Sequence, residues 1–247
     1  MEMDRFQRYV KDFYKDKGGG WPKKDPWHTY SHDKIYEYVK KKMAPYERKE
    51  GYKILNCGSG GTDYGLKCDM YHLDIIREKI DGFTHWKEGS ADDIPYRPEK
   101  FDVVICVGSV LDYCSGPEAL AEMCRVLKPG GRLILEFENS YSMEYLFEKP
   151  FGKEMAFEES EYFGEKHFYW VYSLPFVRRK LGECGAVIED VRFIHIFSAL
   201  IYRLTGNGRI AGWFGRFDRL FQKGHLRGYC GNIILQARKL KGTENAG

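Results

Sequence analysis

The chain has 247 residues and a formal net charge of +3, with 43% hydrophobic and 30% charged residues, which is the composition of an ordinary globular protein. No apolar run approaches the ~18–20 residues that a membrane span needs, and the charged N-terminus is not a secretory signal, so we expect a cytoplasmic protein. The 7 cysteines are scattered without a CxxC pair, which argues against a disulfide framework and against a zinc site.

The first 50 residues are predicted to form an N-terminal helical lid. Apolar residues at helical spacing predict a helix over residues 4–17, followed by an aromatic loop over residues 21–30. A second helix is expected to begin behind Ser31 and to run to about Met43. We expect four side chains of this region to close over bound ligands, namely Trp21, Trp27, Tyr30 and His32.

Residues 51–240 alternate between short apolar strands and helices, which predicts one domain built on a parallel sheet with helices on both faces. The expected strands are residues 53–57, 70–74, 84–87, 101–107, 132–137, 186–197 and 229–238. The expected helices are residues 117–127 and 174–184. Only a turn around residues 62–66 fits between the first two strands.

Two stretches interrupt this alternation and are interpreted as insertions that form a cap. Residues 140–172 are aromatic and acidic without a clear period, so we expect a cap or loop there. Residues 198–228 contain a predicted helix near residues 210–223. Residues 241–247 are expected to be a disordered tail.

The first predicted strand ends in a glycine-rich loop, Asn56-x-Gly58-x-Gly60. Glycines at the carboxyl edge of a parallel sheet let the backbone approach a nucleotide-like ligand. Asp74, at the end of the second strand, can accept hydrogen bonds from both hydroxyls of a ribose. A dehydrogenase loop would need glycine at position 63, which is Asp63, and no Gly-Lys-Ser/Thr follows as in a phosphate-binding loop.

Three further segments accompany this loop: Gly89-Ser90-Ala91-Asp92-Asp93-Ile94-Pro95-Tyr96, Phe101-Asp102-Val103-Val104-Ile105 and Val126-Leu127-Lys128-Pro129-Gly130-Gly131. With these segments and the glycine-rich loop, the chain resembles the class I S-adenosylmethionine-dependent methyltransferase family, particularly its small-molecule type. The resemblance is close over residues 52–138. It implies a doubly wound α/β, Rossmann-like sheet of seven mostly parallel strands whose last strand is antiparallel. It also implies S-adenosylmethionine as the cofactor and S-adenosylhomocysteine as its product.

The resemblance also implies which residues surround the cofactor. The methionine moiety and the ribose would lie against Gly58, Ser59, Gly60, Asp74 and Ile75, the adenine against Ser90, Ala91 and Asp92, and the floor would be Val107 and Gly108. The chain departs from the family pattern at two of the binding positions. Asn56 stands where an acid is usual, although its amide could still bind the methionine amino group, and Ser90 stands where Asp is common.

Methyl transfer from a sulfonium is an in-line displacement that needs alignment and no metal. A general base is required only for a hydroxyl or a protonated amine. The candidates follow the fourth and fifth strands or lie in the cap: Asp112, Tyr113, Glu138 and His167. His28, His32 and Asp33 could be read as metal ligands, but no further ligand cluster accompanies them, so no metal site is predicted.

The leading hypothesis is methyl transfer to an O or N atom of a small molecule or saccharide. Residues 203–241 carry nine Lys or Arg and one acid, Asp218. The helix near 210–223 could contact an anionic membrane and serve a lipid-linked acceptor, form a basic wall for an acidic or phosphorylated acceptor, or present a solvated face. An RNA methyltransferase and a non-catalytic interaction module are the alternatives, and no RNA-binding module supports the former. Both a monomer and a homodimer are compatible with the sequence.

Overall fold

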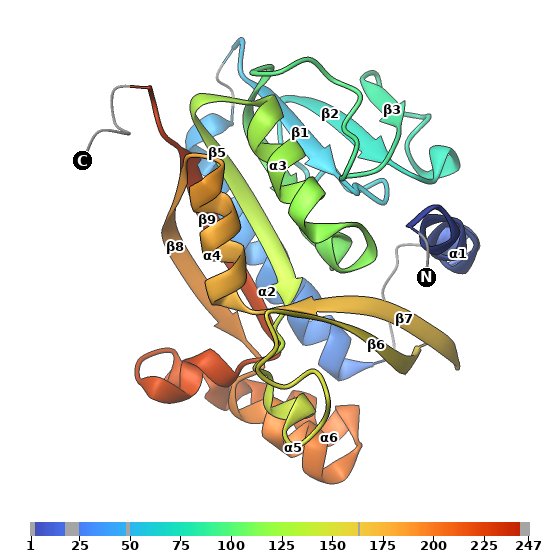
Figure 1. Ribbon diagram of the computed structural model, residues 1–247, viewed down its shortest axis with the longest axis vertical. Helices are drawn as coiled ribbons and strands as arrows, with labels where there is room; N and C mark the ends of the chain where they lie inside the picture. The colour runs from blue at the N-terminus through green and yellow to red at the C-terminus, as the bar shows by residue number, and fades with distance from the viewer. Residues whose placement is uncertain (1–2, 18–24, 48–49, 163, 243–247) are drawn as a thin grey trace.

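The computed structural model describes residues 3–17, 25–47, 50–162 and 164–242. The core is a seven-stranded sheet in the order β3-β2-β1-β4-β5-β9-β8 (Figure 1). Its strands are β1 (Lys53–Cys57), β2 (Asp69–Asp74), β3 (Trp86–Glu88), β4 (Phe101–Cys106), β5 (Leu127–Glu138), β8 (Ala186–Ile194) and β9 (Asn232–Lys239). β9 pairs antiparallel with both β5 and β8, and the other pairings are parallel. The predicted fold class is confirmed.

Helices cover the sheet on both faces, because its inner strands are apolar on both sides. On one face, α3 (Gly116–Val126) and α4 (Leu174–Glu183) pack Leu120, Val177 and Leu181 on the sheet. On the other face, α2 (Pro26–Met43) packs Ile35 and Val39 against the same strands. No helix intervenes between β1 and β2, where the chain makes only turns over residues 59–66, as the short spacing predicts.

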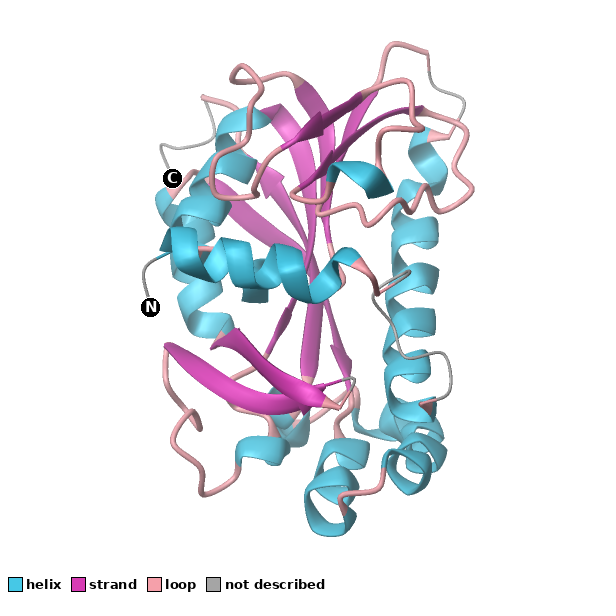
Figure 2. Cartoon of the chain, turned by 90° about the vertical axis from the view of Figure 1, so that its right-hand side faces the viewer, coloured by secondary structure: helices cyan, strands magenta, loops and turns pink. Residues whose placement is uncertain are grey.

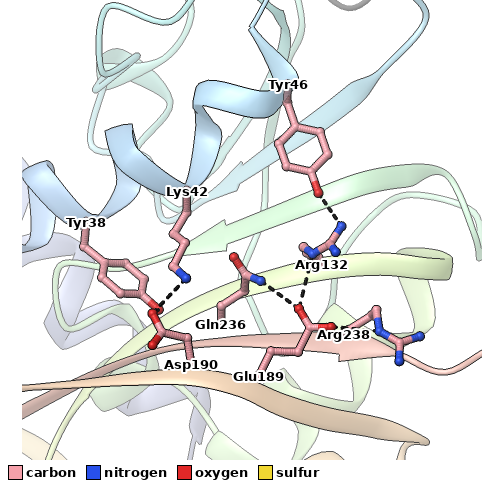
Figure 3. A network of polar contacts seen from close by, with 8 residues as sticks. All are labelled: Tyr38, Lys42, Tyr46, Arg132, Glu189, Asp190, Gln236 and Arg238. Atoms are coloured by element: carbon pink, nitrogen blue, oxygen red, sulfur yellow. Dashed lines mark hydrogen bonds and ion pairs between the residues drawn. The ribbon is translucent and has the colours of Figure 1, made fainter.

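A polar network fastens α2 to the outer part of the sheet (Figure 3). Asp190 of β8 accepts a hydrogen bond from the Tyr38 hydroxyl at 3.0 Å and pairs with Lys42 at 2.8 Å. Past the end of α2, the hydroxyl of Tyr46 accepts a hydrogen bond from Arg132 at 2.6 Å. Arg132 also pairs with Glu189, which lies next to Asp190 on β8. The C-terminal half of α2 is therefore held to β5 and β8.

The cap elements gather at the carboxyl end of β5. A two-stranded hairpin, β6 (Met155–Tyr162) and β7 (Glu165–Tyr172), reaches from β5 toward α1 (Met3–Lys15), as Figures 1 and 2 show. The hydroxyl of Tyr9 on α1 donates to the carbonyl of Lys166 at 3.1 Å, so helix and hairpin are in contact. Below the hairpin in Figure 1 lie α5 (Phe197–Thr205) and α6 (Gly208–Phe214).

Four expectations about elements need correction. The second helix begins at Pro26 and not behind Ser31, because Asp25 caps it and a proline fits its first turn. Residues 140–172 include the β6–β7 hairpin and are not simply a loop. The helix expected near 210–223 is the short α6, continued by a 3-10 helix over Gly215–Phe221. The strand expected over 186–197 ends at Ile194, because Phe197 begins α5. Of the expected tail, residues 243–247 lie outside the described residues.

Asp25→Ala should lower the melting temperature. The Asp25 side chain accepts a hydrogen bond from the Trp27 N–H at 3.0 Å and contacts the His28 ring. Loss of such a cap costs about 1 kcal/mol, which corresponds to roughly 2–4 °C for a chain of this size. Thermal denaturation followed by circular dichroism measures the change. Asp12→Ala, at an exposed position within α1, is the control. An equal melting temperature for Asp25→Ala and the unmodified protein would contradict the assigned cap.

Candidate active site

A cavity of about 730 Å³ lies at the carboxyl edge of the sheet. Its floor comes from the loops after β1, β2, β4 and β5, where the sheet order reverses. α1, α2, the β6–β7 hairpin and α5 supply the other walls. The predicted site residues that line it are Gly58, Ser59, Gly60, Asp74, Ile75, Ser90, Ala91, Val107, Gly108, Tyr113, Glu138 and His167. Asn56, Asp92 and Asp112 do not line it.

The glycine loop is built for close approach of its backbone. Gly58 has φ +66°, and a Cβ there would lie 2.2 Å from a methyl group of Val110, so no side chain fits. The N–H groups of Gly58 and Ser59 both donate to the carbonyl of Leu73, at 2.8 and 3.0 Å. Gly60 also has positive φ, +53°, but a Cβ there would meet nothing within 4 Å. The loop is therefore tied to the end of β2 and open toward the cavity.

Asp74 is oriented by backbone donors. One carboxylate oxygen accepts from the Gly60 N–H at 2.7 Å and the other from the Ile76 N–H at 2.9 Å. Burial raises the pKa of Asp74, while these donors, the Ile75 N–H and nearby Lys79 act in the opposite direction. A carboxylate has about four acceptor positions, so these donors leave room for a hydroxyl of a ligand. This arrangement fits the ribose of the cofactor that the family resemblance implies.

The segment after β3 joins the cavity to α1. Ser90 and the buried Ala91 line the cavity. Asp92 instead accepts hydrogen bonds from the side chain of Gln7 at 3.0 Å and from the Ser115 N–H at 3.0 Å. The Gln7 amide also donates to the Ser90 hydroxyl at 3.3 Å. Asp92 thus fastens α1 over this end of the cavity.

Asn56 has an internal partner. Its side chain is buried, and its amide nitrogen donates to the Thr62 carbonyl at 2.7 Å. The Asn56 amide therefore stabilises the turn that replaces a helix between β1 and β2. The structure does not bring this side chain to the cavity surface.

The loop after β4 rests on a carboxylate that sequence reasoning missed. Glu136, on β5, is fully buried and accepts from the N–H groups of Gly108 and Ser109 at 2.9 and 2.7 Å. Its other oxygen accepts from the Asn232 side chain at 2.8 Å. Burial raises the pKa of Glu136, and these donors oppose the shift. Its place in an otherwise apolar strand, Leu-Ile-Leu-Glu-Phe, was the available signal.

Tyr113 and His167 lie in a chain of hydroxyl and imidazole groups. The Tyr14 hydroxyl donates to the Tyr113 hydroxyl at 2.8 Å, and Tyr113 lies 2.9 Å from His167 Nε2. The other ring nitrogen lies 3.2 Å from the Tyr9 hydroxyl. Burial lowers the pKa of His167 to about 4, so its ring is neutral near pH 7 and can accept a proton from a neighbouring hydroxyl.

Glu138 lines the cavity beside a second carboxylate, Glu144, which sequence reasoning also missed. Tyr145 donates to Glu138 at 2.8 Å and approaches the Tyr169 hydroxyl at 3.1 Å. Burial, reinforced by Glu144, raises the pKa of Glu138 to about 8. Burial also raises the pKa of Glu144 to about 7. Glu144 follows β5 in a short 3-10 helix, Met143–Tyr145, which no sequence pattern predicts.

Asp112 does not reach the cavity. It is fully buried, and its carboxylate accepts from the backbone N–H of Glu138 at 3.2 Å. Burial and the neighbouring Glu138 and Glu136 raise its pKa. In this position Asp112 orients the end of β5 and does not face a ligand.

Two of the four side chains that are expected to close over bound ligands line the cavity. Trp27 and His32 line the cavity, together with His28 and Ser31. The ring of Tyr30 instead lies against Gly215 and His195. Trp21 lies outside the described residues. Among the residues that the structure describes, no three His, Cys, Asp or Glu form a group that could hold a metal ion.

Comparison with known proteins places this site in a family. Residues 55–135 match the model of a methyltransferase domain. The chain is 32% identical over 184 residues to an uncharacterized protein of Methanocaldococcus jannaschii, covering 67% of this chain and 80% of that protein. Among solved structures, a candidate S-adenosylmethionine-dependent methyltransferase of Listeria monocytogenes superposes with a TM-score of 0.59 at 13% identity, covering 86% and 100% of the two chains. The chain belongs to the class I S-adenosylmethionine-dependent methyltransferase family. It is an enzyme whose methyl donor is S-adenosylmethionine.

Two further matches concern the acceptor side. The chain is 34% identical over 113 residues to the ubiquinone/menaquinone biosynthesis C-methyltransferase of Vibrio parahaemolyticus, and the match spans 36% of this chain and 42% of that enzyme. A 1,6-didemethyltoxoflavin-N1-methyltransferase of Burkholderia thailandensis, solved with its substrate and S-adenosylhomocysteine, superposes with a TM-score of 0.52 at 10% identity, covering 96% and 85% of the two chains. The named acceptors of these proteins differ, and both matches are partial or distant.

Among the described residues, no helix has the length and apolar character required to cross a membrane.

The two raised carboxyl pKa values predict that stability falls as pH rises. Glu138 and Glu144 hold protons in the folded protein up to about pH 8 and 7, above the ordinary value of 4.5. Retention of these protons therefore stabilises the fold. The contribution is fully present below about pH 4.5 and is lost as pH rises from there through the folded values. We expect the melting temperature of the unliganded protein to fall by several degrees between pH 6.5 and 8.5.

A variant carrying both Glu138→Gln and Glu144→Gln should show a flatter profile over the same range. Asp112 also titrates differently in this variant, because Glu138 helps to raise its pKa. The remaining change in the profile reports on Glu138 and Glu144. Glu183→Gln, at an exposed carboxylate paired with Lys180 on α4, is the control. Parallel pH profiles for the double variant and the unmodified protein would show that these carboxyls do not titrate in this window.

Proposed function

We propose that this enzyme transfers a methyl group to an O or N atom of a small-molecule or saccharide acceptor. The observation that carries the proposal is the continuity of the cavity. Gly58, Asp74 and Ala91 line one end, and Tyr113 and Glu138 line the other. A volume of about 730 Å³ lies within the range of ~300–1,000 Å³ typical of small-molecule sites.

The cofactor residues proposed are those that the family pattern assigns: Asn56, Gly58, Ser59, Gly60, Asp74, Ile75, Ser90, Ala91, Asp92, Val107 and Gly108. Asp74, with Ile75, would hold the ribose, and the backbone near Ala91 would meet the adenine. Asn56 and Asp92 would act indirectly, since their side chains hold the loop and α1. S-Adenosylmethionine supplies an electrophilic methyl group, so the protein must align the acceptor with it.

Glu138 is the best-supported proton acceptor among the four candidates. It lines the cavity, and a base works best when its pKa lies near the operating pH, a condition that a pKa of about 8 meets. His167, the other candidate that lines the cavity with Tyr113, meets this condition less well, because burial lowers its pKa to about 4 and both ring nitrogens contact tyrosine hydroxyls. Asp112 would serve as a positioning residue through the backbone of Glu138.

We further propose that residues 1–50 act as a lid and that segments 140–172 and 198–228 form the acceptor cap of the domain over residues 51–240. Support comes from the side chains that these segments send to the cavity, including Tyr14, Trp27, Glu144 and Tyr202. A cavity of this volume walled by such segments favours a small acceptor over an RNA strand.

Transfer of a ¹³C-methyl group tests the reaction. The purified protein would be incubated with methyl-labelled S-adenosylmethionine and separate pools of alcohols, amines, saccharides, quinols and tRNA. The carbon chemical shift of each product distinguishes O-, N- and C-methyl groups. We expect labelled O- or N-methyl products from a small-molecule pool. Label found only on carbon, or only on tRNA, would overturn the proposal.

Asp74→Asn should weaken binding of S-adenosylhomocysteine by about tenfold or more, because charge-assisted hydrogen bonds contribute about 1.5–3 kcal/mol. Isothermal titration calorimetry measures the change. Asp69→Asn provides a matched control, since Asp69 begins the same strand and is exposed beside His85. Equal affinities for Asp74→Asn and the unmodified protein would contradict the proposed ribose site.

A further inference from the structure

The acceptor end of the cavity carries more carboxyl groups than basic groups. Six glutamates line the cavity, and they are Glu138, Glu144, Glu148, Glu158, Glu159 and Glu161. Among the described residues, the Lys and Arg side chains that line it are Lys79, Lys149 and Arg203. Lys79 belongs to the cofactor end, where it acts on Asp74. Lys149 and Arg203 therefore face six carboxylates.

The outer and inner carboxylates have different partners. Glu148 pairs with Arg203 at 2.8 Å, and Glu159 pairs with Lys166 at 2.6 Å. The inner pair, Glu138 and Glu144, is bonded only to neutral hydroxyls among the described residues. The Tyr145 hydroxyl donates to Glu138 at 2.8 Å, and the Ser142 hydroxyl donates to Glu144 at 3.2 Å. Two neighbouring carboxylates withdrawn from water without a counter-ion are costly to ionise.

Aromatic rings share the cavity with this inner pair. Its lining includes Trp27, Tyr113, Tyr145, Tyr169 and Tyr202. The ring of Trp27 is stacked on Tyr202, with centroids 4.8 Å apart, and on His195, with centroids 3.5 Å apart, so its faces already have partners. Open ring faces attract cations, so the tyrosine rings near the two carboxyl groups favour the same kind of ligand group.

We propose that the methyl acceptor is a cationic amine whose ammonium group is held by Glu138 and Glu144 among these aromatic rings. This inference rests on the proposed function and narrows it to N-methylation. Before transfer, an N–H proton passes from the ammonium to the Glu138 carboxylate. The nitrogen lone pair then forms the new N–C bond, the S–C bond breaks, and its electron pair stays on the sulfur of S-adenosylhomocysteine.

The basic residues of the C-terminal third do not counter this assignment. Arg209, Arg216, Arg219 and Lys223 are exposed on the outside of the cap, and none of them lines the cavity. A basic wall for an acidic acceptor would need such side chains inside. The ionisable groups that a ligand meets at this end of the cavity are mainly the glutamates, and a bound cation favours their charged form.

Matched pairs of probes test the sign of the preferred charge. Calorimetry would compare tyramine with 4-hydroxyphenylacetate, histamine with imidazole-4-acetate, and agmatine with 4-guanidinobutanoate. The protein is first saturated with S-adenosylhomocysteine. We expect the amine to bind at least tenfold more tightly in at least one pair and the acid to be preferred in none. Preference for an acid in any pair, or no binding by any of the amines, would overturn the inference.

Variants of Glu144 then test whether this side chain causes the preference for amines. Glu144→Gln should weaken amine binding at least tenfold, whereas Glu144→Asp, which keeps the charge, should retain most of it. Glu183→Gln should change nothing. All three should bind S-adenosylhomocysteine as the unmodified protein does, which also verifies folding. An equal loss of amine and S-adenosylhomocysteine binding in Glu144→Gln would mean that this carboxylate serves the cofactor, and the inference would be wrong.

Failure of the inference is separable from failure of the proposed function. If the unmodified protein does not bind S-adenosylhomocysteine, the proposed cofactor site itself is wrong. If it binds the cofactor product and transfers methyl groups only to uncharged hydroxyl acceptors, the proposed function stands and the amine assignment falls.

Discussion

The buried carboxylate of Glu136 holds together the strand ends on which the cavity is built. It lies on β5, accepts two backbone N–H groups from the loop after β4, and accepts the side chain of Asn232 at the start of β9. Gly108 and Ser109 adopt positive φ angles of +84° and +61°, a conformation unusual for serine. Without this acceptor, two part-buried N–H groups would lose their hydrogen-bond partner, at a cost of up to about 1–3 kcal/mol each. The floor of the site therefore depends on one carboxylate that has no contact with a cation in the described structure.

This arrangement places several acids close together. Glu138 and Glu136 help to raise the pKa of Asp112, and Glu144 and Glu136 help to raise that of Glu138. Glu136 and Asp112 obtain backbone donors, whereas the partners of Glu138 and Glu144 within the described part of the chain are hydroxyl groups. The repulsion that remains is concentrated where a ligand can relieve it. A folded protein commonly tolerates such unfavourable electrostatic free energy at its functional site and compensates for it with stabilising interactions elsewhere.

The sheet and the cofactor edge could be predicted because their signals are local. A strand end, a glycine loop and an acid at the next strand end follow one another within about twenty residues, as Gly58 and Asp74 do. Asp25-Pro26 is also a pattern typical of a helix start, but the aromatic residues after it favour a loop in the sequence analysis. The β6–β7 hairpin could not be predicted from the pattern of polar and apolar residues. Along β7, buried His167 and Tyr169 alternate with aromatic residues of the other face, so the strand shows no polar–apolar period. Glu144 depends on where a 3-10 turn lies in space, which no sequence spacing encodes.

α2 links the acceptor cap to the stability of the sheet. Its N-terminal half sends Trp27, His28 and Ser31 to the cavity, and its C-terminal half is held to β8 through Tyr38 and Lys42. Ser31 also contacts the buried ring of His195 at 2.6 Å, which joins this wall to the start of α5. One helix, α2, therefore both lines the cavity and is attached to the sheet. The cavity walls formed by α2 and α5 are held in place relative to the strands that form the cofactor edge. Alignment of an acceptor with a methyl group requires that relation, since displacement of the reacting atoms by about 1 Å can cost a hundredfold in rate.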